Sequence, residues 1–495
     1  MATAAAFCAA LLVRGGVTVG CEAQPPAKDA NTAMQAMFRI NWAVWDIIRP
    51  HFSRTGPPVY SAPLNLPMNW IAKAGSLLAT IFVIGAACKA PVAESVAASP
   101  VLTYDVSYTV VPLPQQGAAE VQMRVNQPRS LLRELRFAAS PRISNSKADG
   151  ELLSAAGEIV WRPPATGGTL RWTVSIASRR NGNGYDAWLG EDWGLMRVED
   201  LIPRATTLAV RNAASRTTLQ FRLPADWSVV TPYADQGGRF SVNKTGRRFD
   251  QPDGWIVMGR LGVRHETIAG IRVAVAAPVG HSVRRMDILA LLNWTLPELS
   301  RVIPDLPSRL LIASAGDPMW RGGLSAPQSL YVHADRPLIS ENSTSTLLHE
   351  VMHSTLRFTS RTGYDWIVEG LAEYYSLELL RRSGSISQAR FKIALQSQVR
   401  WSKSAKKLCQ RSSNGPVTAL AVVILAALDT EIRSASDGAS SLDDLLRLLR
   451  RNQQPLDLDL LAATTQRLTG TASAVLDIDK LPGCRSFAAA GQDHD

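Results

Sequence analysis

Two of the seven histidines in this 495-residue chain lie four residues apart, in the stretch LLHEVMHSTL. Residues i and i+4 of a helix share one face, so His349 and His353 can present two imidazoles to one cation. Neutral imidazole suits Zn²⁺, and Glu350 would stand beside the open coordination position as a proton acceptor. The alternative interpretation of this HExxH string is an ordinary solvated helix face.

The helix predicted next, DWIVEGLAEYY, has two carboxylates on one face. Glu369 can complete a His, His, Glu ligand set for one zinc ion per chain. A zinc-bound histidine usually donates its other N–H to a carboxylate, and we expect Glu373 to be that partner, for His349. The competing interpretation is that both glutamates are surface charges.

The elements that must position these residues have mixed character. Helices are predicted over residues 345–357 and 366–382, on either side of the turn TSRTGYD. Before them come a segment with helical spacing and two strand-like runs: RRMDILALLNWTLPELSRVI, SRLLIASAG and QSLYVHA. We therefore expect an α+β domain over residues 281–400 that contains the candidate zinc site.

Two further domains are expected on either side of this one, so the fold class is multidomain α+β. Over residues 99–280, short alternating runs from LTYDVSYTVV to IRVAVAA, separated by turn residues, predict an antiparallel, sandwich-like β domain. Residues 401–495 predict a helical domain. Its stretch VTALAVVILAALDTEIR is apolar nearly all round, which indicates a helix buried in a protein core. Ser441 and Asp444 form a capping box that opens a later helix.

Residues 1–98 are interpreted as a leader. Residues 68–90 have the order of a secretory signal, with Lys73, an apolar run and then small residues. Cys88 resembles a lipoprotein cleavage site, which would anchor the chain to a membrane. We expect an exported protein of the bacterial periplasm or envelope, with Met68 as the true start. The alternative is a long N-terminal region with an internal membrane anchor.

The cysteines and the charge agree with export. Removal of the leader leaves Cys409 and Cys484, an even pair that predicts a disulfide in an oxidising compartment; the alternative is two buried thiols. With 46% apolar and 19% charged residues the composition is globular. The formal charge is +11, but Lys and Arg are scattered, so we expect no nucleic-acid partner. The oligomeric state does not follow from the sequence.

At these residues the chain resembles the gluzincin zinc metallopeptidases, which join HExxH to a downstream glutamate helix. WIVEGLAEYYSLELLRRSGSIS resembles the glycyl aminopeptidase family and, more distantly, the aminopeptidase N family, and the resemblance extends over residues 100–484. It implies a thermolysin-like catalytic domain that hydrolyses peptide or protein substrates. It also implies that His349, His353 and Glu369 are zinc ligands and that Glu350 is the general base.

Two motifs depart from the family pattern. Relatives carry Gly-Gly-Leu-Glu-His or Gly-Ala-Met-Glu-Asn on an edge strand, and here GGLSAPQSLYVHA has Ser325 and Ala326 at the Glu and His positions. Relatives also carry Tyr-x-Lys-Gly, whose tyrosine stabilises the oxyanion, and here SSNG places Ser412 and Asn414 at the Tyr and Lys positions. Loss of an oxyanion donor typically costs about 10²- to 10³-fold in rate.

Other side chains are candidates to replace the missing oxyanion or substrate-binding groups. Tyr331 and His333 alternate along the expected edge strand, and Tyr374 or Tyr375 follows the ligand Glu369. The alternative for each is packing in the core. The leading hypothesis is an exported zinc metallopeptidase whose exo or endo specificity is open. The second is a pseudopeptidase that binds zinc and acts as an envelope scaffold.

Overall fold

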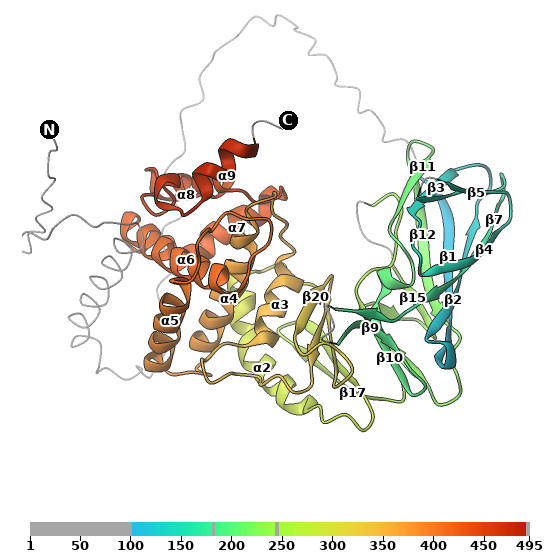
Figure 1. Ribbon diagram of the computed structural model, residues 1–495, viewed down its shortest axis with the longest axis horizontal. Helices are drawn as coiled ribbons and strands as arrows, with labels where there is room; N and C mark the ends of the chain where they lie inside the picture. Colours follow the sequence, from blue (N-terminus) through green and yellow to red (C-terminus); the bar gives the residue numbers. More distant parts are fainter. Residues whose placement is uncertain (1–100, 156, 181–183, 243–246, 492–495) are drawn as a thin grey trace, which may run out of the picture. The chain divides into compact units, whose positions relative to one another are not determined.

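The computed structural model describes residues 101–155, 157–180, 184–242 and 247–491 (Figure 1). The predictions for residues 1–98, including the signal over 68–90 and Cys88, lie outside these residues. Within them the chain has a β-rich N-terminal part, a mixed part that carries the HExxH motif, and a helical C-terminal part. The predicted multidomain α+β class therefore agrees with the structure at this level.

The longest strands of the β-rich part are those with the clearest alternation of apolar and polar residues. In β2 (Ala118–Asn126) Val121, Met123 and Val125 are buried while the residues between them are more exposed. The seven-stranded sheet has the order β14-β15-β12-β1-β2-β7-β4. Its other strands are β1 (Leu102–Leu113), β4 (Ile143–Ala148), β7 (Gly167–Ser175), β12 (Ala213–Phe221), β14 (Ala234–Asp235) and β15 (Arg239–Ser241).

The predicted all-antiparallel pairing of this part is wrong at one position. Strand β1 pairs parallel with β12, from Leu102 beside Ala213 to Val110 beside Phe221, so the sheet is mixed. Two smaller sheets complete the part. One contains β11 (Ala205–Ala209), β3 (Leu132–Ala138), β6 (Glu158–Arg162) and β5 (Glu151–Ala155); the other contains β13 (Ser228–Val230), β16 (Trp255–Gly259), β10 (Trp193–Arg197), β9 (Tyr185–Leu189) and β8 (Ser178–Arg179).

The sheet that positions the HExxH motif has the order β17-β18-β19-β21-β20. Its strands are β17 (Leu261–Ile268), β18 (Ile271–Pro278), β19 (Arg309–Ala315), β20 (Gly323–Ala326) and β21 (Ser329–His333). β18, β19 and β21 run parallel, α2 (Arg285–Val302) connects β18 to β19, and β20 pairs antiparallel with β21 at the edge. This corrects one assignment. The run IRVAVAA was placed in the β domain, but as β18 its hydrogen bonds join it to β19.

The helical predictions around the motif are confirmed to within one residue. α3 (Thr346–Leu356) and α4 (Asp365–Arg382) flank the predicted turn. After them come α5 (Gln388–Ser402), α6 (Gly415–Ala435), α7 (Leu442–Asn452), α8 (Leu458–Thr469) and α9 (Cys484–Gly491). The capping box of α7 is also present, since the Asp444 carboxylate accepts the N–H of Ser441. The other predicted domain boundaries stay predictions.

Helix α6 is the central helix of the C-terminal part. It packs against α4, α5, α7 and α8, and Leu420, Ile424 and Leu428 are among its buried residues. Among the described residues it is the one helix whose length and composition would suit a membrane span, but more than half of its most apolar window is buried inside the protein. A disulfide joins Cys409, in the loop before α6, to Cys484 at the start of α9.

Candidate metal centre

Helix α3 is held so that its histidines lie on the side away from the core. The hydroxyl of Ser345 accepts the N–H of Leu348 and caps the first turn. Leu348, Val351 and Met352 are fully buried. The helix packs on β20 and β21, where the Ser354 hydroxyl donates to the carbonyl of Ser329. Because burial fixes the rotation of the helix, the opposite face of α3 is turned toward α4.

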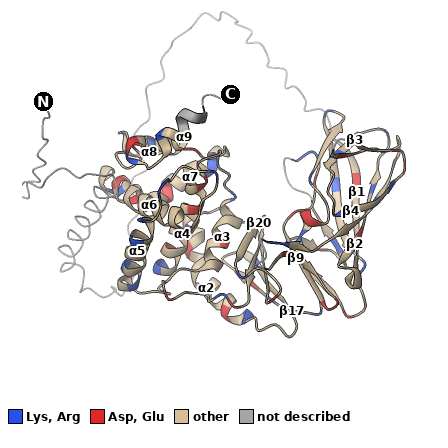
Figure 2. Ribbon diagram, in the orientation of Figure 1, with Lys and Arg blue, Asp and Glu red and all other residues tan. Residues whose placement is uncertain are grey.

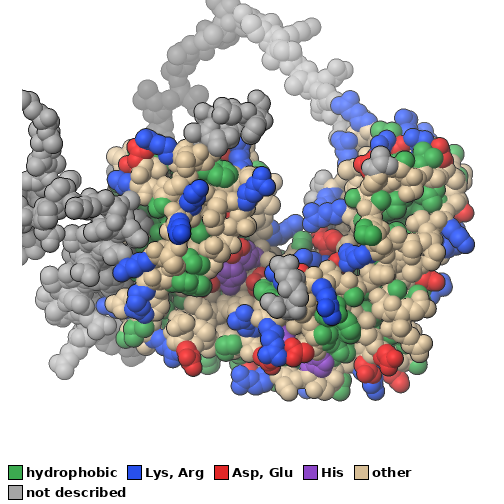
Figure 3. Space-filling model, viewed as in Figure 1, with side chains coloured by type: hydrophobic (Ala, Val, Ile, Leu, Met, Phe, Trp, Pro, Cys, Tyr) green, Lys and Arg blue, Asp and Glu red, His purple; other side chains and the backbone are tan. Residues whose placement is uncertain are grey.

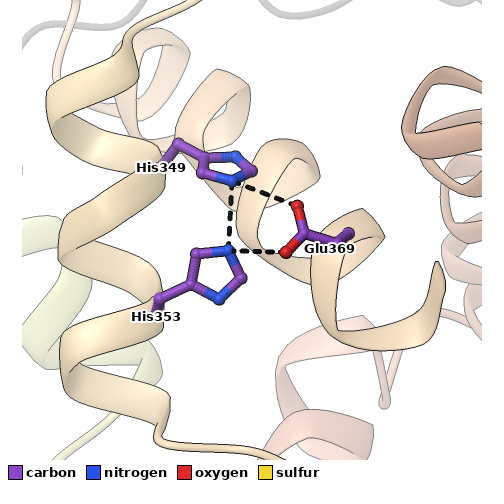
Figure 4. A group of neighbouring side chains, drawn as sticks. All are labelled: His349, His353 and Glu369. Atoms are coloured by element: carbon purple, nitrogen blue, oxygen red, sulfur yellow. Dashed lines mark hydrogen bonds and ion pairs between the residues drawn. The ribbon is translucent and has the colours of Figure 1, made fainter. Parts of the chain in front are cut away.

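The two histidines of α3 and the first glutamate of α4 converge on one point (Figure 4). The Nε2 atoms of His349 and His353 are 3.0 Å apart. One oxygen of Glu369 lies 3.4 Å from Nε2 of His349, and the other lies 3.3 Å from Nε2 of His353. Histidine-coloured atoms are visible in a hollow near the middle of the molecule in Figure 3, and the side chains of His349, His353 and Glu369 are 17%, 15% and 30% exposed. The cluster is therefore both compact and open to solvent on one side.

These three side chains fit a zinc ion by the chemistry and spacing of their donors. Zn²⁺ bound at about 2.0 to 2.1 Å in a tetrahedron holds its ligand atoms about 3.3 Å apart. The separation of 3.0 Å between the two Nε2 atoms, and those of 3.3 and 3.4 Å from them to different oxygens of the Glu369 carboxylate, lie close to that value. Three protein donors leave a fourth position open, which is the arrangement of catalytic rather than structural zinc sites.

Glu373 orients the first of the histidines. Its carboxylate lies 3.0 Å from Nδ1 of His349, one helical turn beyond Glu369 on α4. This contact leaves Nε2 of the ring for a metal, which is the usual role of a carboxylate behind a zinc ligand. Burial lowers the pKa of His349, but hydrogen bonds to Glu369 and Glu373 outweigh it and raise that pKa well above the ordinary value.

The opposite effect acts on Glu369. Burial raises the pKa of its carboxyl, but the hydrogen bonds from His349 and His353 dominate and lower the pKa well below the ordinary value. Glu369 is therefore ionised at any physiological pH. An ionised carboxylate beside two imidazoles is a donor set that suits Zn²⁺.

Glu350 lies against the edge strand β20. A Cβ placed on Gly323 of β20 would be 2.8 Å from Cγ of Glu350, so the strand leaves room for this side chain only because residue 323 is glycine. Burial raises the pKa of Glu350, and the charges of the two histidines and a hydrogen bond with Ser325 lower it in part. A carboxylate with a raised pKa is well suited to accept a proton near neutral pH.

The structure does not bring the candidate oxyanion groups of the sheet to this cluster. β21 is an interior strand, and β20 forms the edge, which corrects the expectation that Tyr331 and His333 lie on an edge strand. Tyr331 is fully buried in the core between β16 and β19, where its hydroxyl donates to the carbonyl of Trp320. His333 is fully buried, and its Nδ1 accepts the N–H of Asp335.

The tyrosines of α4 also point elsewhere. Tyr374 is buried, with its hydroxyl 3.5 Å from Asp429 of α6. Tyr375 donates to Asp443 of α7. Both lie on the side of α4 that packs on the C-terminal helices. This position agrees with the alternative given for them from the sequence, which is packing in the core.

Three polar contacts of the site were missed from the sequence. Ser325 bonds to Glu350, and the carboxylate of Asp365 accepts the N–H of Ser413 at 2.8 Å. Asp365 is four residues before Glu369 on α4, so the SSNG segment lies one helical turn from Glu369. Asn414 of that segment caps α6 by accepting the N–H of Val417. The i, i+4 spacing of Asp365 and Glu369 was the available signal.

Comparisons with known proteins find similarity in fold but not in sequence. No protein-family model matches the chain, and no curated protein matches it in sequence. A solved aminopeptidase N family protein from Idiomarina loihiensis is similar over 74% of this chain and 77% of its own, with a TM-score of 0.56 and 16% identity. An M1 zinc metallopeptidase variant from Deinococcus radiodurans aligns over 77% and 96%, with a TM-score of 0.49 and 16% identity. The chain thus shares its fold with an aminopeptidase N family protein.

Proposed function

We propose that the protein is an exported zinc metallopeptidase that uses Glu350 as its general base. The observation that carries the proposal is the His349, His353 and Glu369 cluster, with donor separations that suit one zinc ion and Glu350 on the same helix beside it. The similarity to a solved aminopeptidase N family protein supports it, although the identity is 16%. The nearer resemblance to the glycyl aminopeptidases stays a prediction.

The proposed reaction is hydrolysis of a peptide bond. A zinc ion at the cluster would polarise the scissile carbonyl and lower the pKa of a water molecule. Glu350 then accepts the proton of that water and passes it to the leaving amine. Glu373 keeps His349 in the tautomer and orientation that leave Nε2 free. The substrate class is a peptide or protein, with one zinc ion per chain.

The test measures zinc and hydrolysis on the same preparations. Elemental analysis of the parent and of Glu350→Gln should find about one zinc per chain, and His353→Ala should have much less, because only the last change removes a ligand. The parent should cleave members of a peptide library, and Glu350→Gln should not. A folded parent without zinc, or a Glu350→Gln variant with full activity, would exclude the proposal.

Export is part of the proposal and rests on the signal-like residues 68–90 and on the disulfide between Cys409 and Cys484. Disulfides are stable in oxidising compartments such as the periplasm. Fractionation of the producing cells, with N-terminal sequencing of the product, should find a chain that begins near residue 90. A product that retains residues 1–67 would contradict both the expected cleavage and the expected start at Met68.

A second candidate function is a zinc-binding pseudopeptidase that serves as a scaffold. The observation in its favour is that Tyr331, His333 and Tyr374 all lie in packed surroundings away from the cluster. Loss of an oxyanion donor costs about 10²- to 10³-fold in rate. This candidate predicts one zinc per chain with no hydrolysis that depends on Glu350, so the same two measurements separate the two functions.

A further inference from the structure

The charge of the C-terminal part is uneven along the chain. Between Glu378 and Asp429 there is no Asp or Glu, and this interval contains α5 and the loop that follows it. Figure 2 shows Lys and Arg along α5 without an acidic residue between them. The segment from Arg400 to Arg411 is the most basic part of the interval, and we call its five cations the basic loop: Arg400, Lys403, Lys406, Lys407 and Arg411.

The basic loop is exposed and lacks acidic partners. All five side chains are exposed to solvent. Arg400 donates to the hydroxyl of Ser397, and within the described part of the chain none of the five is paired with a carboxylate. Many other surface arginines of the protein are paired in this way, for example Arg321 with Asp317 at 2.7 Å. The loop therefore has a positive charge that is not neutralised locally.

Two large apolar side chains lie beside these cations. Trp401 is 53% exposed, with its ring against Gly415, and Ile393 is 58% exposed two turns earlier on α5. Ile393 and Arg400, seven residues apart, share one face of the helix. The side chains of tryptophan and isoleucine have a higher free energy in water than in an apolar environment, so their transfer out of water is favourable. The combination of apolar and cationic side chains on one surface indicates a partner that is both apolar and anionic.

We propose that α5 and the basic loop form a docking face for the anionic surface of a membrane. Amphipathic surfaces with Lys and Arg around Trp or Leu bind at the boundary between headgroups and acyl chains. Trp401 and Ile393 would enter this boundary, and the lysines would contact lipid phosphates. Ile393 and Trp401 are eight positions apart, which spans about 12 Å of helix and suits a broad surface better than a single peptide side chain.

Nucleic acid fits this face less well than a membrane does. Proteins that bind single strands stack successive bases on several aromatic side chains along a groove. Here Trp401 is the one exposed large aromatic residue of α5 and the loop among the described residues, and its neighbour on the helix is aliphatic. An aliphatic side chain provides no stacking surface, but it partitions readily into an acyl layer.

The first test measures whether Trp401 enters the lipid. The full chain is mixed with vesicles of phosphatidylcholine and phosphatidylglycerol that carry brominated acyl chains, which quench nearby tryptophan emission. We expect Trp401→Phe to remove the contribution of one tryptophan from the quenched emission. The matched control, Trp294→Phe, should leave the quenching unchanged. Trp294 of α2 is also exposed, at 62%, but arginines near it in the chain are neutralised by ion pairs, Arg284 with Asp287 and Arg301 with Glu298.

The second test removes charge. The variant K403Q/K406Q/K407Q should lower the partition coefficient, followed through the Trp401 signal, by about fivefold per lysine, or about a hundredfold in total. The control R124Q/R133Q/R239Q removes three exposed arginines of the β strands and should leave the partition unchanged. Neither readout uses zinc or hydrolysis, so failure here is distinct from failure of the proposed peptidase activity.

Each outcome decides the proposal. Quenching of Trp401 on anionic vesicles, weak on pure phosphatidylcholine and lost in the lysine variant, supports it. Absence of Trp401 quenching overturns it, even if the leader holds the protein on the vesicles, because the signal reports this face alone. Equal quenching on neutral and anionic vesicles also overturns the role of the basic loop. Binding of an oligonucleotide through the three lysines, without quenching by lipid, would replace the membrane by nucleic acid.

Discussion

The carboxylate of Glu373 lies 3.0 Å from Nδ1 of His349, while Nε2 of the same ring lies 3.4 Å from Glu369. The two glutamates are one turn apart on α4 and hold the imidazole from both of its nitrogens. The two carboxylates therefore contact different nitrogens of one ring, as the separate roles predicted for them require. Glu369 faces the nitrogen available to a metal, and Glu373 determines which nitrogen that is.

The first prediction concerns Glu373. In Glu373→Gln the side chain keeps its size but loses its charge, so His349 is a weaker ligand. We expect zinc affinity to fall by about 10- to 100-fold, as is typical for partners behind a zinc ligand. Competition with a chromogenic chelator measures the change. Glu431→Gln, a matched change at a carboxylate that bonds to Ser473 and Ala474 away from α3, should leave the affinity as it is.

The second prediction concerns pH. In the metal-free chain, hydrogen bonds to Glu369 and Glu373 outweigh burial and raise the pKa of His349, so a proton competes with zinc up to a higher pH than usual. Zinc affinity should rise by about tenfold per pH unit below that pKa and level off above it. Chelator competition between about pH 5.5 and about 8.5 tests this dependence. An affinity that is constant over this range would contradict the proposed ligand.

The raised pKa of His349 also makes the stability of the metal-free fold depend on pH. A raised pKa in the folded state stabilises the metal-free fold below the unfolded histidine pKa of about 6.5. This contribution is lost as the pH rises through the folded pKa of His349. Urea unfolding of the chelator-treated protein should show this loss, and Glu373→Gln, which removes one of the two partners, should show less of it.

The third prediction concerns the room that Gly323 leaves for Glu350. In Gly323→Ala the new methyl group would lie 2.8 Å from Cγ of Glu350 and 2.6 Å from Cγ2 of Thr346, so Glu350 must move. We expect retained zinc and hydrolysis reduced by about tenfold to a hundredfold, since small displacements of a reacting group are costly. Ala326→Ser, on the other face of β20, is the control. Unchanged hydrolysis would mean that Glu350 does not need this position.

The fourth prediction concerns the disulfide. Cys409 and Cys484 are 75 residues apart, and the bond closes a loop that contains α6, α7 and α8. The variant C409S/C484S should lose about 2 to 5 kcal/mol of unfolding free energy, as when a native disulfide is removed. Urea unfolding with and without reductant measures this loss. Reductant should destabilise the parent and leave the double variant unchanged; equal effects on both would contradict the assignment.

Much of the site was predictable because its geometry is local. His349 and His353, and likewise Glu369 and Glu373, are pairs at i and i+4, and the helical period alone places each pair on one face. The boundaries of α3 and α4 follow from local signals, with Ser345 as the N-cap and Gly363 in the turn between them. The helical period does not bring the two helices together. The expectation that they converge came from the donor set of His349, His353 and Glu369, which suits one zinc ion.

The predictions that were wrong all concern which segments become neighbours in the folded chain. Alternation along QSLYVHA correctly predicts a strand, but it does not say that β20 will cover its outer edge, so Tyr331 and His333 were expected near the site and lie in the core. IRVAVAA was likewise predicted as a strand and joined to the wrong sheet, because its partner β19 is reached only after the α2 crossover.

The sequence by itself therefore predicted the two helices and the residue pairs on them, His349 with His353 and Glu369 with Glu373, since these depend on residue type and on spacings of four positions. The zinc-binding roles of these residues and the role of Glu350 as base stay predictions. The tertiary structure decided which nitrogen of His349 faces Glu369 and that Glu350 contacts Gly323 and Ser325. It also decided that the tyrosines are buried in packed cores. These features depend on the rotation of packed helices and on the order of strands in a sheet. Burial of apolar surface across the whole chain sets both, and no local pattern contains that information.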